Sequence, residues 1–293
     1  MSTSTPAARI STPRLAFPAL VLASLILPLG PVLVRLSDVG PVAAAFWRLA
    51  IALPFLLLLA RPGLTRTPPT AREWTALLLA GLVFAADLAA WHIGIHYTKV
   101  ANATVFGNMS GLFLPAWALL VLRQKPTAMQ SAALTLAGVG ALIMMGGSYE
   151  LSIGNLHGDL LCLLAGVFYT AYLLIVQDAR GRLDSWSVLA VSSVASTLPL
   201  LLCALWLGER VMPGNWTPLV ILALSSQLIG QGLLTYAIGW FSPLVLGVSL
   251  LLQPAVAAVL GWLLFDEWLG PTDMLGTVAV GTALVLVRLP SRA

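Results

Sequence analysis

The sequence predicts an all-α integral membrane protein with ten transmembrane helices in two inverted five-helix repeats. Three observations lead to this fold class. Of the 293 residues, 59% are hydrophobic and only 9% are charged, whereas soluble domains carry about 25% charged residues. Apolar runs of about 20 residues, which is the length of a membrane-spanning helix, recur along the whole chain. A weak internal repeat relates the second half of the chain to the first.

Ten apolar runs follow one another with short connections. The first run comes after Arg9 and Arg14, as the apolar core of a signal peptide would. At about 22 residues it exceeds the 7 to 15 residues of such a core, so we expect it to remain as a helix. The ten expected spans are residues 15–36, 41–60, 74–96, 100–122, 128–146, 158–178, 186–207, 216–238, 242–264 and 272–287.

These spans leave no room for a soluble domain. We expect a first five-helix repeat at 15–146 and a second at 158–287, joined by an extracytoplasmic connector at 147–157. The Ser-, Thr- and Pro-rich residues 1–14 are expected to form a disordered cytoplasmic tail, because they contain little to bury. Residues 288–293 form a second cytoplasmic tail.

Basic residues in the connections predict the orientation, because Lys and Arg are enriched in cytoplasmic loops. With the N-terminus in the cytoplasm, eleven basic residues lie on the cytoplasmic side, and three, Arg35, Lys99 and Arg210, lie on the other. We therefore expect a multi-pass protein of the inner (plasma) membrane with both termini in the cytoplasm. Topology accounts for the net charge of +4, and we expect no binding to nucleic acid.

The internal repeat predicts that the two halves have opposite orientations. At a spacing of 142 residues, the Trp-Thr pair at 74–75 corresponds to the pair at 216–217, and Lys125 corresponds to Glu267. Because five helices is an odd number, the second copy must be inverted relative to the first. Inverted repeats recur in transporters, which bind their substrates near the membrane midplane between the repeats.

Two related segments carry a resemblance to a known family. They are residues 102–126 (NATVFGNMSGLFLPAWALLVLRQKP) and residues 247–281, which contain Pro254 and Glu267. This pattern resembles the ten-helix EamA type of the drug/metabolite transporter superfamily, and the resemblance covers nearly the whole chain. It implies two inverted five-helix repeats and export of small organic molecules. Within the superfamily, the chain also resembles the YddG-type exporters of aromatic amino acids and methyl viologen.

Polar and aromatic side chains occur at similar depths in several expected spans. At about 1.5 Å per helical residue, most of them lie about 12 to 16 Å from the outer ends, and His92 lies about 6 Å from its end. An ionisable side chain inside an apolar span marks a functional site by default. The residues that we expect to bind substrate are Asp87, Trp91, His92, Asn108, Tyr169, Gln227 and Gln253.

Each of these residues also has a structural interpretation. Arg48 and Asp87 lie at similar depth on consecutive helices, so they form either a buried ion pair or a contact to substrate. Trp91 shares a helix face with Asp87, and it serves either as an interfacial anchor or as a cavity wall. His92 could simply be hydrated near the outer end, and Gln227 could join two helices. His92 and His96 have a metal-ligand spacing, but no third ligand accompanies them, so we expect no metal site.

Three prolines are expected to shape moving helices. A proline inside a helix leaves the carbonyl four residues earlier without its partner. Pro115 and Pro254 would act in this way on Gly111 and Leu250, and Pro28 would bend the first span. We assign these prolines, together with Arg48, a structural or coupling role.

The expected function is export of small organic metabolites by alternating access around a midplane cavity. A single acid and a single base among amides and aromatic rings suit aromatic or other hydrophobic amino acids, and a broad organic cation or drug exporter is the alternative. A membrane-embedded enzyme is disfavoured, because the sequence has no HExxH motif and no Ser/His pair in matching spans. We expect a monomer in the lipid bilayer, with a small-molecule substrate and with no catalytic residue or cofactor.

Overall fold

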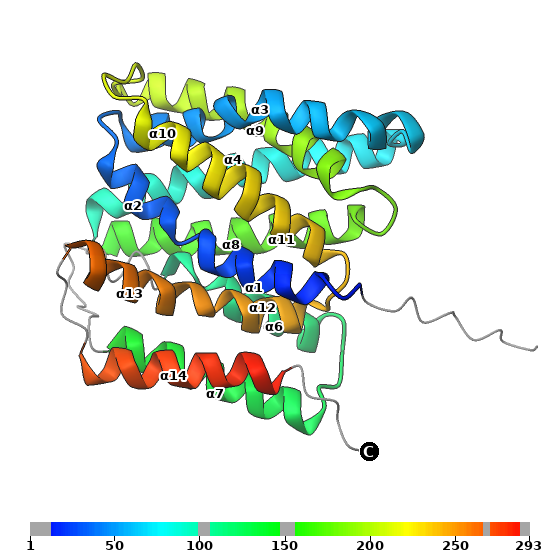
Figure 1. The fold of residues 1–293 in the computed structure, drawn as a ribbon, viewed down its shortest axis with the longest axis vertical. Coiled ribbons are helices and arrows are strands. Elements are labelled where there is room, and N and C mark those ends of the chain that lie inside the picture. Colours follow the sequence, from blue (N-terminus) through cyan, green and yellow to red (C-terminus); the bar gives the residue numbers. More distant parts are fainter. Residues whose placement is uncertain (1–12, 99–105, 147–155, 266–269, 288–293) are drawn as a thin grey trace, which may run out of the picture.

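The computed structural model describes residues 13–98, 106–146, 156–265 and 270–287 (Figure 1). The described residues form helices throughout. In chain order they are α1 (Ala16–Ile26), α2 (Leu29–Leu36), α3 (Pro41–Arg66), α4 (Ala71–Tyr97), α6 (Ser110–Leu120), α7 (Ala128–Gly146), α8 (Leu156–Ala179), α9 (Ser185–Trp206), α10 (Thr217–Leu222), the π-helix η2 (Ala223–Gly230), α11 (Gln231–Ile238), α12 (Pro243–Leu250), α13 (Leu252–Phe265) and α14 (Pro271–Leu286). Most of the predicted tails and connector lies outside the described residues.

The described helices make ten passes through one bundle, because three passes consist of consecutive segments. These three are α1 with α2, α10 with η2 and α11, and α12 with α13. Figure 1 shows the helices side by side, with both ends of the described chain on the same side of the bundle. We call this side the termini end and the other side the opposite end. Arg61, Arg66 and Arg182 lie in or beside connections at the termini end.

The helices have the length and composition of membrane spans. Six of them, counting α1 with α2 and α10 with η2 and α11, are long and apolar enough to cross a bilayer, and shorter apolar helices accompany them. Large apolar side chains such as Phe55, Leu58 and Leu198 are exposed on the outer surface. In a bilayer these side chains face lipid rather than water. The predicted all-α membrane fold is therefore confirmed.

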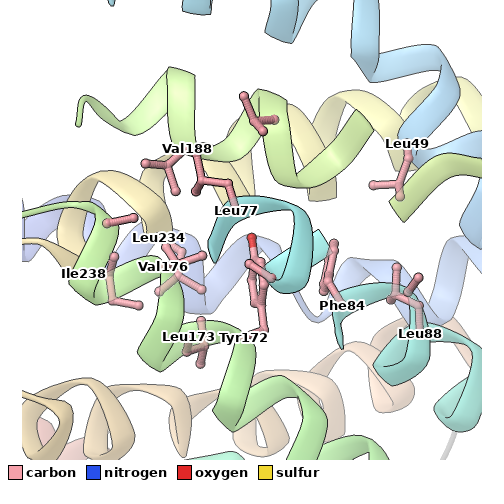
Figure 2. Packing of buried hydrophobic residues seen from close by; sticks show 14 of the residues in the cluster. Leu49, Leu77, Phe84, Leu88, Tyr172, Leu173, Val176, Val188, Leu234 and Ile238 are labelled. Atoms are coloured by element: carbon pink, nitrogen blue, oxygen red, sulfur yellow. The ribbon is translucent and has the colours of Figure 1, made fainter. Parts of the chain in front are cut away.

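The two repeats interlock rather than lying apart. Helices of the first repeat pack against helices of the second in four pairs: α3 with α9, α4 with α8, α6 with α12, and α7 with α14. The pair α7 and α14 forms one edge of the bundle (Figure 1). The main core lies between α4, α8 and α11, where Leu77, Phe84, Tyr172 and Leu234 are buried together (Figure 2). The centre of the bundle is therefore surrounded by helices of both repeats.

The pair α3 and α9 is antiparallel, and a carboxylate caps the N-terminus of each helix. Glu209, just after α9, accepts the backbone N–H groups of Val42 (3.2 Å) and Ala43 (2.8 Å) in the first turn of α3. Asp184 caps α9 itself by accepting from the N–H groups of Trp186 and Ser187. A carboxylate in this position satisfies free N–H groups and complements the helix dipole.

Loops at the two ends of the bundle are tied by charged groups. At the opposite end, Asp38 accepts a 2.7 Å hydrogen bond from the N–H of Gly214 and pairs with Arg210 at 3.4 Å. The hydrogen bond from Gly214, with a smaller effect of Arg210, holds the pKa of Asp38 below its ordinary value. At the termini end, Arg182 pairs with Glu73. Such exposed pairs contribute little stability but fix which loops meet.

Four of the predicted continuous spans are interrupted within the described residues, one of them (100–122) by a turn at Asn108. The first span stops at Leu27 and resumes at Leu29, so Pro28 stands between two helices. The pass containing Pro254 divides at Leu251, where that proline is expected to disturb the carbonyl of Leu250. The pass from 217 to 238 changes into the π-helix η2 at mid-length. No proline lies in η2, so the residue pattern gave no sign of this irregularity.

Pro115 has a different effect from the other two prolines, because α6 continues through it without a break. A Cβ atom at Gly247 would lie 2.5 Å from Pro115 Cγ and 2.7 Å from the carbonyl oxygen of Gly111. The carbonyl that Pro115 leaves free therefore meets the backbone of α12 at Gly247. The proline and the two glycines bring α6 and α12 together at the centre of the bundle.

Candidate substrate cavity

A cavity lies inside the bundle, from its middle toward the opposite end. The space open to the centres of water molecules is about 120 Å³, and about 10 to 15 Å³ of this measure holds one water. Leu27, Gly30, Pro31 and Val34 of the interrupted first pass form one apolar side. The polar and aromatic lining consists of Arg48, Phe84, Asp87, Trp91, His92, Asn108, Tyr169, Gln231 and Gln253.

Helix α4 supplies four of the nine polar and aromatic residues of the lining, more than any other helix. Phe84, Asp87, Leu88 and Trp91 recur at intervals of three and four residues, so they lie on one side of the helix and all line the cavity. Asp87 is buried, with 9% of its surface exposed. Its carboxylate forms no hydrogen bond or ion pair with any residue that the structure describes. Asp87 therefore presents an unpaired carboxylate to the cavity.

Arg48 does not form the direct ion pair with Asp87 that matching depth suggested. The Arg48 Nε–H donates to Oε1 of Gln227 at 3.1 Å instead, and among the described residues no ion pair joins Arg48 to Asp87. The two groups are close enough to interact electrostatically. The amide of Gln227 also donates from Nε2 to Ser193 Oγ at 3.0 Å. Gln227 thus holds Arg48 through Nε and is itself held by Ser193.

The aromatic side chains form a connected group. Phe84 of α4 stacks on Tyr172 of α8, with ring centroids 4.5 Å apart at 18°, and Figure 2 shows these two rings side by side. Tyr169, one turn from Tyr172, lies 6.0 Å from it and lines the cavity. The guanidinium of Arg48 lies 5.9 Å from the centre of the Phe84 ring, where a cation and a ring attract each other.

Trp91 and His92 occupy the end of the cavity away from the termini. Their rings meet edge to face at 5.0 Å. His92 is 2% exposed, and its Nδ1 lies 2.5 Å from the carbonyl oxygen of Leu88. Because a carbonyl oxygen can only accept, Nδ1 carries the proton of this bond. His92 is therefore buried in the bundle and oriented by the backbone of α4.

Asn108 lies in a turn just before α6. In this turn the N–H of Met109 bonds the carbonyl of Phe106, and the N–H of Gly111 bonds the carbonyl of Asn108. The helix axis thus begins anew beside the cavity. A Cβ atom at Gly107 would lie 2.7 Å from Cδ1 of Trp91, so the indole rests directly on the glycine backbone.

The structure brings together six of the seven predicted binding residues. Asp87, Trp91, His92, Asn108, Tyr169 and Gln253 line the cavity. Gln227 does not line it, because its amide is used between Arg48 and Ser193. Gln231, one turn later, takes that place, and the shared helix face of the two glutamines was the available signal.

Phe84 and Pro31 also line the cavity, although neither was among the residues predicted to bind substrate. Phe84 lines the cavity three residues before Asp87, and helical spacing from Asp87 could have identified it. Pro28, Pro115 and Pro254 do not line the cavity, whereas Pro31 does. The prolines that we assigned a coupling role therefore act on helix geometry beside the cavity.

Contacts at the termini end join α8, α1 and the residues that follow α11. Gln177 donates from Nε2 to the carbonyl oxygen of Phe241 at 2.6 Å, and Arg180 Nε donates to the carbonyl oxygen of Thr235 at 2.9 Å. The rings of Phe17 and Phe241 meet edge to face at 6.2 Å. The two hydrogen bonds join α8 to α11 and the residues after it, and the ring contact joins α1 to Phe241.

Interlocked helices of two inverted repeats, with a polar cavity at mid-depth, define a membrane transporter. The model of the EamA-like transporter family matches residues 14–146 and 156–289, and the chain belongs to this family. An uncharacterized transporter of Archaeoglobus fulgidus is 24% identical over 212 residues, which are 71% of this chain and 72% of that protein. One solved crystal structure shares the fold at a TM-score of 0.77 and 14% identity, over 94% of this chain and 95% of the other.

Proposed function

We propose that this transporter exports aromatic or other hydrophobic amino acids across the inner membrane, as a monomer with both termini in the cytoplasm. Alternating access around the cavity moves the substrate from one side to the other. The observation that carries the proposal is the composition of the lining: Phe84, Trp91 and Tyr169 line the same cavity as one acid, Asp87, and one base, Arg48. The ring of an aromatic amino acid would contact the aromatic side chains, and its two charged groups would contact Asp87 and Arg48.

The number of basic groups argues against strongly anionic substrates. Recognition of phosphate favours several Arg or Lys side chains, and Arg48 is the single Arg or Lys in the described lining of the cavity. An organic cation is the second candidate, because the Asp87 carboxylate has no hydrogen-bond or ion-pair partner in the described part of the chain. Amino acids are the stronger candidate, because Arg48 faces the same space as Asp87.

Efflux from proteoliposomes tests this proposal. Wild-type protein should export phenylalanine and tryptophan faster than threonine. Trp91→Ala and Tyr169→Ala should each lower export of the aromatic amino acids by roughly two- to tenfold, because a good aromatic contact contributes about 0.5 to 1.5 kcal/mol. Threonine export should change much less.

Two controls separate the ring from other effects. Trp117→Ala removes an indole of α6 that is 42% exposed and outside the cavity lining, and it should leave the preference unchanged. Tyr169→Phe keeps the ring but loses the hydroxyl that accepts from Gln231 at 3.3 Å. Equal losses for threonine and phenylalanine in Trp91→Ala and Tyr169→Ala, at equal protein levels, would contradict the proposal. Transport of methyl viologen without amino acids would establish the cation exporter instead.

A further inference from the structure

We infer that the cavity recognises the two charged ends of a zwitterion separately, with Arg48 for the carboxylate and Asp87 with Gln231 for the ammonium group, and that Gln227 is the positioning residue that keeps these two charges apart. The inference rests on the proposed function, because it specifies how an amino acid would be held. It also distinguishes amino acids from the organic cations that a single acid would otherwise admit.

Arg48 lines the cavity and has N–H donors that the described residues do not use. A guanidinium has five N–H donors, and the described residues engage it through Nε alone, at Gln227 Oε1. The Nη groups therefore form no hydrogen bond with the described part of the chain, while Arg48 lines the cavity. Paired N–H groups of a guanidinium match the two oxygens of a carboxylate. A substrate carboxylate would therefore accept hydrogen bonds from the Nη groups of Arg48.

Asp87 and Gln231 are acceptors that lack donors. Gln231 is 2% exposed, and its Nε2 donates to the hydroxyl of Tyr169 at 3.3 Å. Its Oε1 is buried and has no hydrogen-bond partner among the described residues. The Asp87 carboxylate is likewise unpartnered there. Buried acceptors without donors are costly, so a ligand with N–H groups would satisfy both.

The nature of these acceptors selects the kind of cation. A primary ammonium group has three N–H donors, which can serve Asp87 and Gln231 at once. A quaternary ammonium or bipyridinium cation has no N–H donor, so it would leave Gln231 Oε1 unsatisfied. The two acceptors thus favour an α-ammonium group over a fully substituted cation.

Gln227 prevents Arg48 from forming an ion pair with Asp87, which would neutralise both charges. Its amide is fully buried in η2 and is fixed on both sides, by Arg48 and by Ser193. Without this acceptor, the guanidinium would turn to the nearby carboxylate, because a charged acceptor is stronger than an amide. The resulting ion pair would neutralise both recognition groups. The π-turn that carries Gln227 is the kind of helix irregularity that often accompanies functional sites.

The test compares three ligands that share a ring and differ in charge. Phenylalanine, 2-phenylethylamine and 3-phenylpropionate are measured as competitors of counterflow in proteoliposomes. Wild-type protein should bind phenylalanine at least about tenfold more tightly than the other two, because each loses a charged hydrogen-bonding end. Equal affinities for all three in the wild-type protein would overturn the inference without any variant.

Removing the charge of Arg48 and removing the charge of Asp87 should change the preference among the three ligands in opposite directions. Arg48→Gln should weaken phenylalanine about tenfold and leave 2-phenylethylamine unchanged, whereas Asp87→Asn should weaken phenylalanine and leave 3-phenylpropionate unchanged. Asp178→Asn is the matched control, because Asp178 is exposed on α8 and away from the cavity. Proportional losses for all three ligands in Arg48→Gln and Asp87→Asn would overturn the inference.

A suppressor experiment tests the positioning role of Gln227. Gln227→Leu should abolish selective binding of phenylalanine, because Arg48 then pairs with Asp87. Adding Asp87→Asn to Gln227→Leu should free Arg48 and restore binding of 3-phenylpropionate. A purely structural role of Gln227 would give no such recovery, so additive losses would overturn this part.

A second ligand series separates this inference from the proposed aromatic preference. Leucine, 3-methylbutylamine and 4-methylpentanoate carry the same three charge patterns without a ring. If leucine is selected over its amine and acid but phenylalanine is not bound, the zwitterion site stands and the aromatic preference fails. If phenylalanine, 2-phenylethylamine and 3-phenylpropionate bind equally well, the aromatic preference stands and the zwitterion site fails.

Discussion

Gly107 sets how closely Trp91 approaches the cavity wall. A Cβ atom there would lie 2.7 Å from Cδ1 of the indole, closer than such atoms can approach. Gly107→Ala should therefore displace the ring and lower phenylalanine export by roughly two- to tenfold, which is the value of one aromatic contact. Efflux of phenylalanine and threonine from proteoliposomes measures the effect.

The matched control for this substitution is Gly138→Ala in α7. A Cβ atom at Gly138 would make only an ordinary contact of 3.9 Å with Leu112. The same methyl group should leave phenylalanine export unchanged there. If Gly107→Ala also left it unchanged, Trp91 would not be held by the glycine.

Single residues show how far depth along a helix can locate a site. Counting residues brought Asp87 and Tyr169 to one layer, and helical spacing put Trp91 on the same face as Asp87. The structure places all three around one cavity. The same count suggested a direct pair between Arg48 and Asp87, which does not form in the described part of the chain. The choice of Gln227 as partner depends on side-chain direction across the bundle, and depth contains no information about direction.

At the scale of helices, the carboxylate caps of α3 and α9 should each contribute measurably to stability. Glu209→Ala removes the acceptor for Val42 and Ala43, and Asp184→Ala removes the acceptor for the first N–H groups of α9. Loss of a cap costs about 0.5 to 2 kcal/mol. Each variant should lower the thermal midpoint of the detergent-solubilised protein.

The two caps lie at opposite ends of the antiparallel pair of helices, so their effects should add. Glu209→Gln should cost less than Glu209→Ala, because the amide oxygen still accepts one hydrogen bond. A midpoint unaffected by Glu209→Ala would show that water replaces this cap in the folded protein.

Helix boundaries were more predictable than helix interruptions. Hydrophobic length predicted the passes, because a span must cross about 30 Å of hydrocarbon. Pro28 and Pro254 indicated the interruptions near them. The π-helix η2 had no such signal, since its sequence ALSSQLIG contains no proline. Its central Gln227 bonds residues of α3 and α9, so the irregularity occurs where tertiary contacts act, which local sequence does not encode.

For the whole molecule, cysteine labelling of intact cells tests the orientation. Arg66 at the termini end and Met212 at the opposite end are exposed. In a background without Cys162 and Cys203, Met212→Cys should react with a membrane-impermeant maleimide in intact cells. Arg66→Cys should react only after permeabilisation, because basic loops stay in the cytoplasm.

Labelling of Arg66→Cys in intact cells would reverse the assigned orientation. The fold itself would remain, because the alternation of helix directions does not depend on which side is inside. The prediction of orientation depends on the summed charge of many loops rather than on any one contact.

The length of α3 has a consequence for the surrounding lipid. Its 26 residues extend about 39 Å, which exceeds the hydrocarbon thickness by several ångströms. The excess beyond Ala60 carries Arg61 and Arg66, and Arg72 begins the next helix nearby. With this end of the bundle in the cytoplasm, we expect these guanidinium groups to reach the phosphate layer, where each is worth about 1 kcal/mol next to acidic headgroups. We therefore expect the hairpin between α3 and α4 to anchor the bundle to anionic lipid and to set its height in the bilayer.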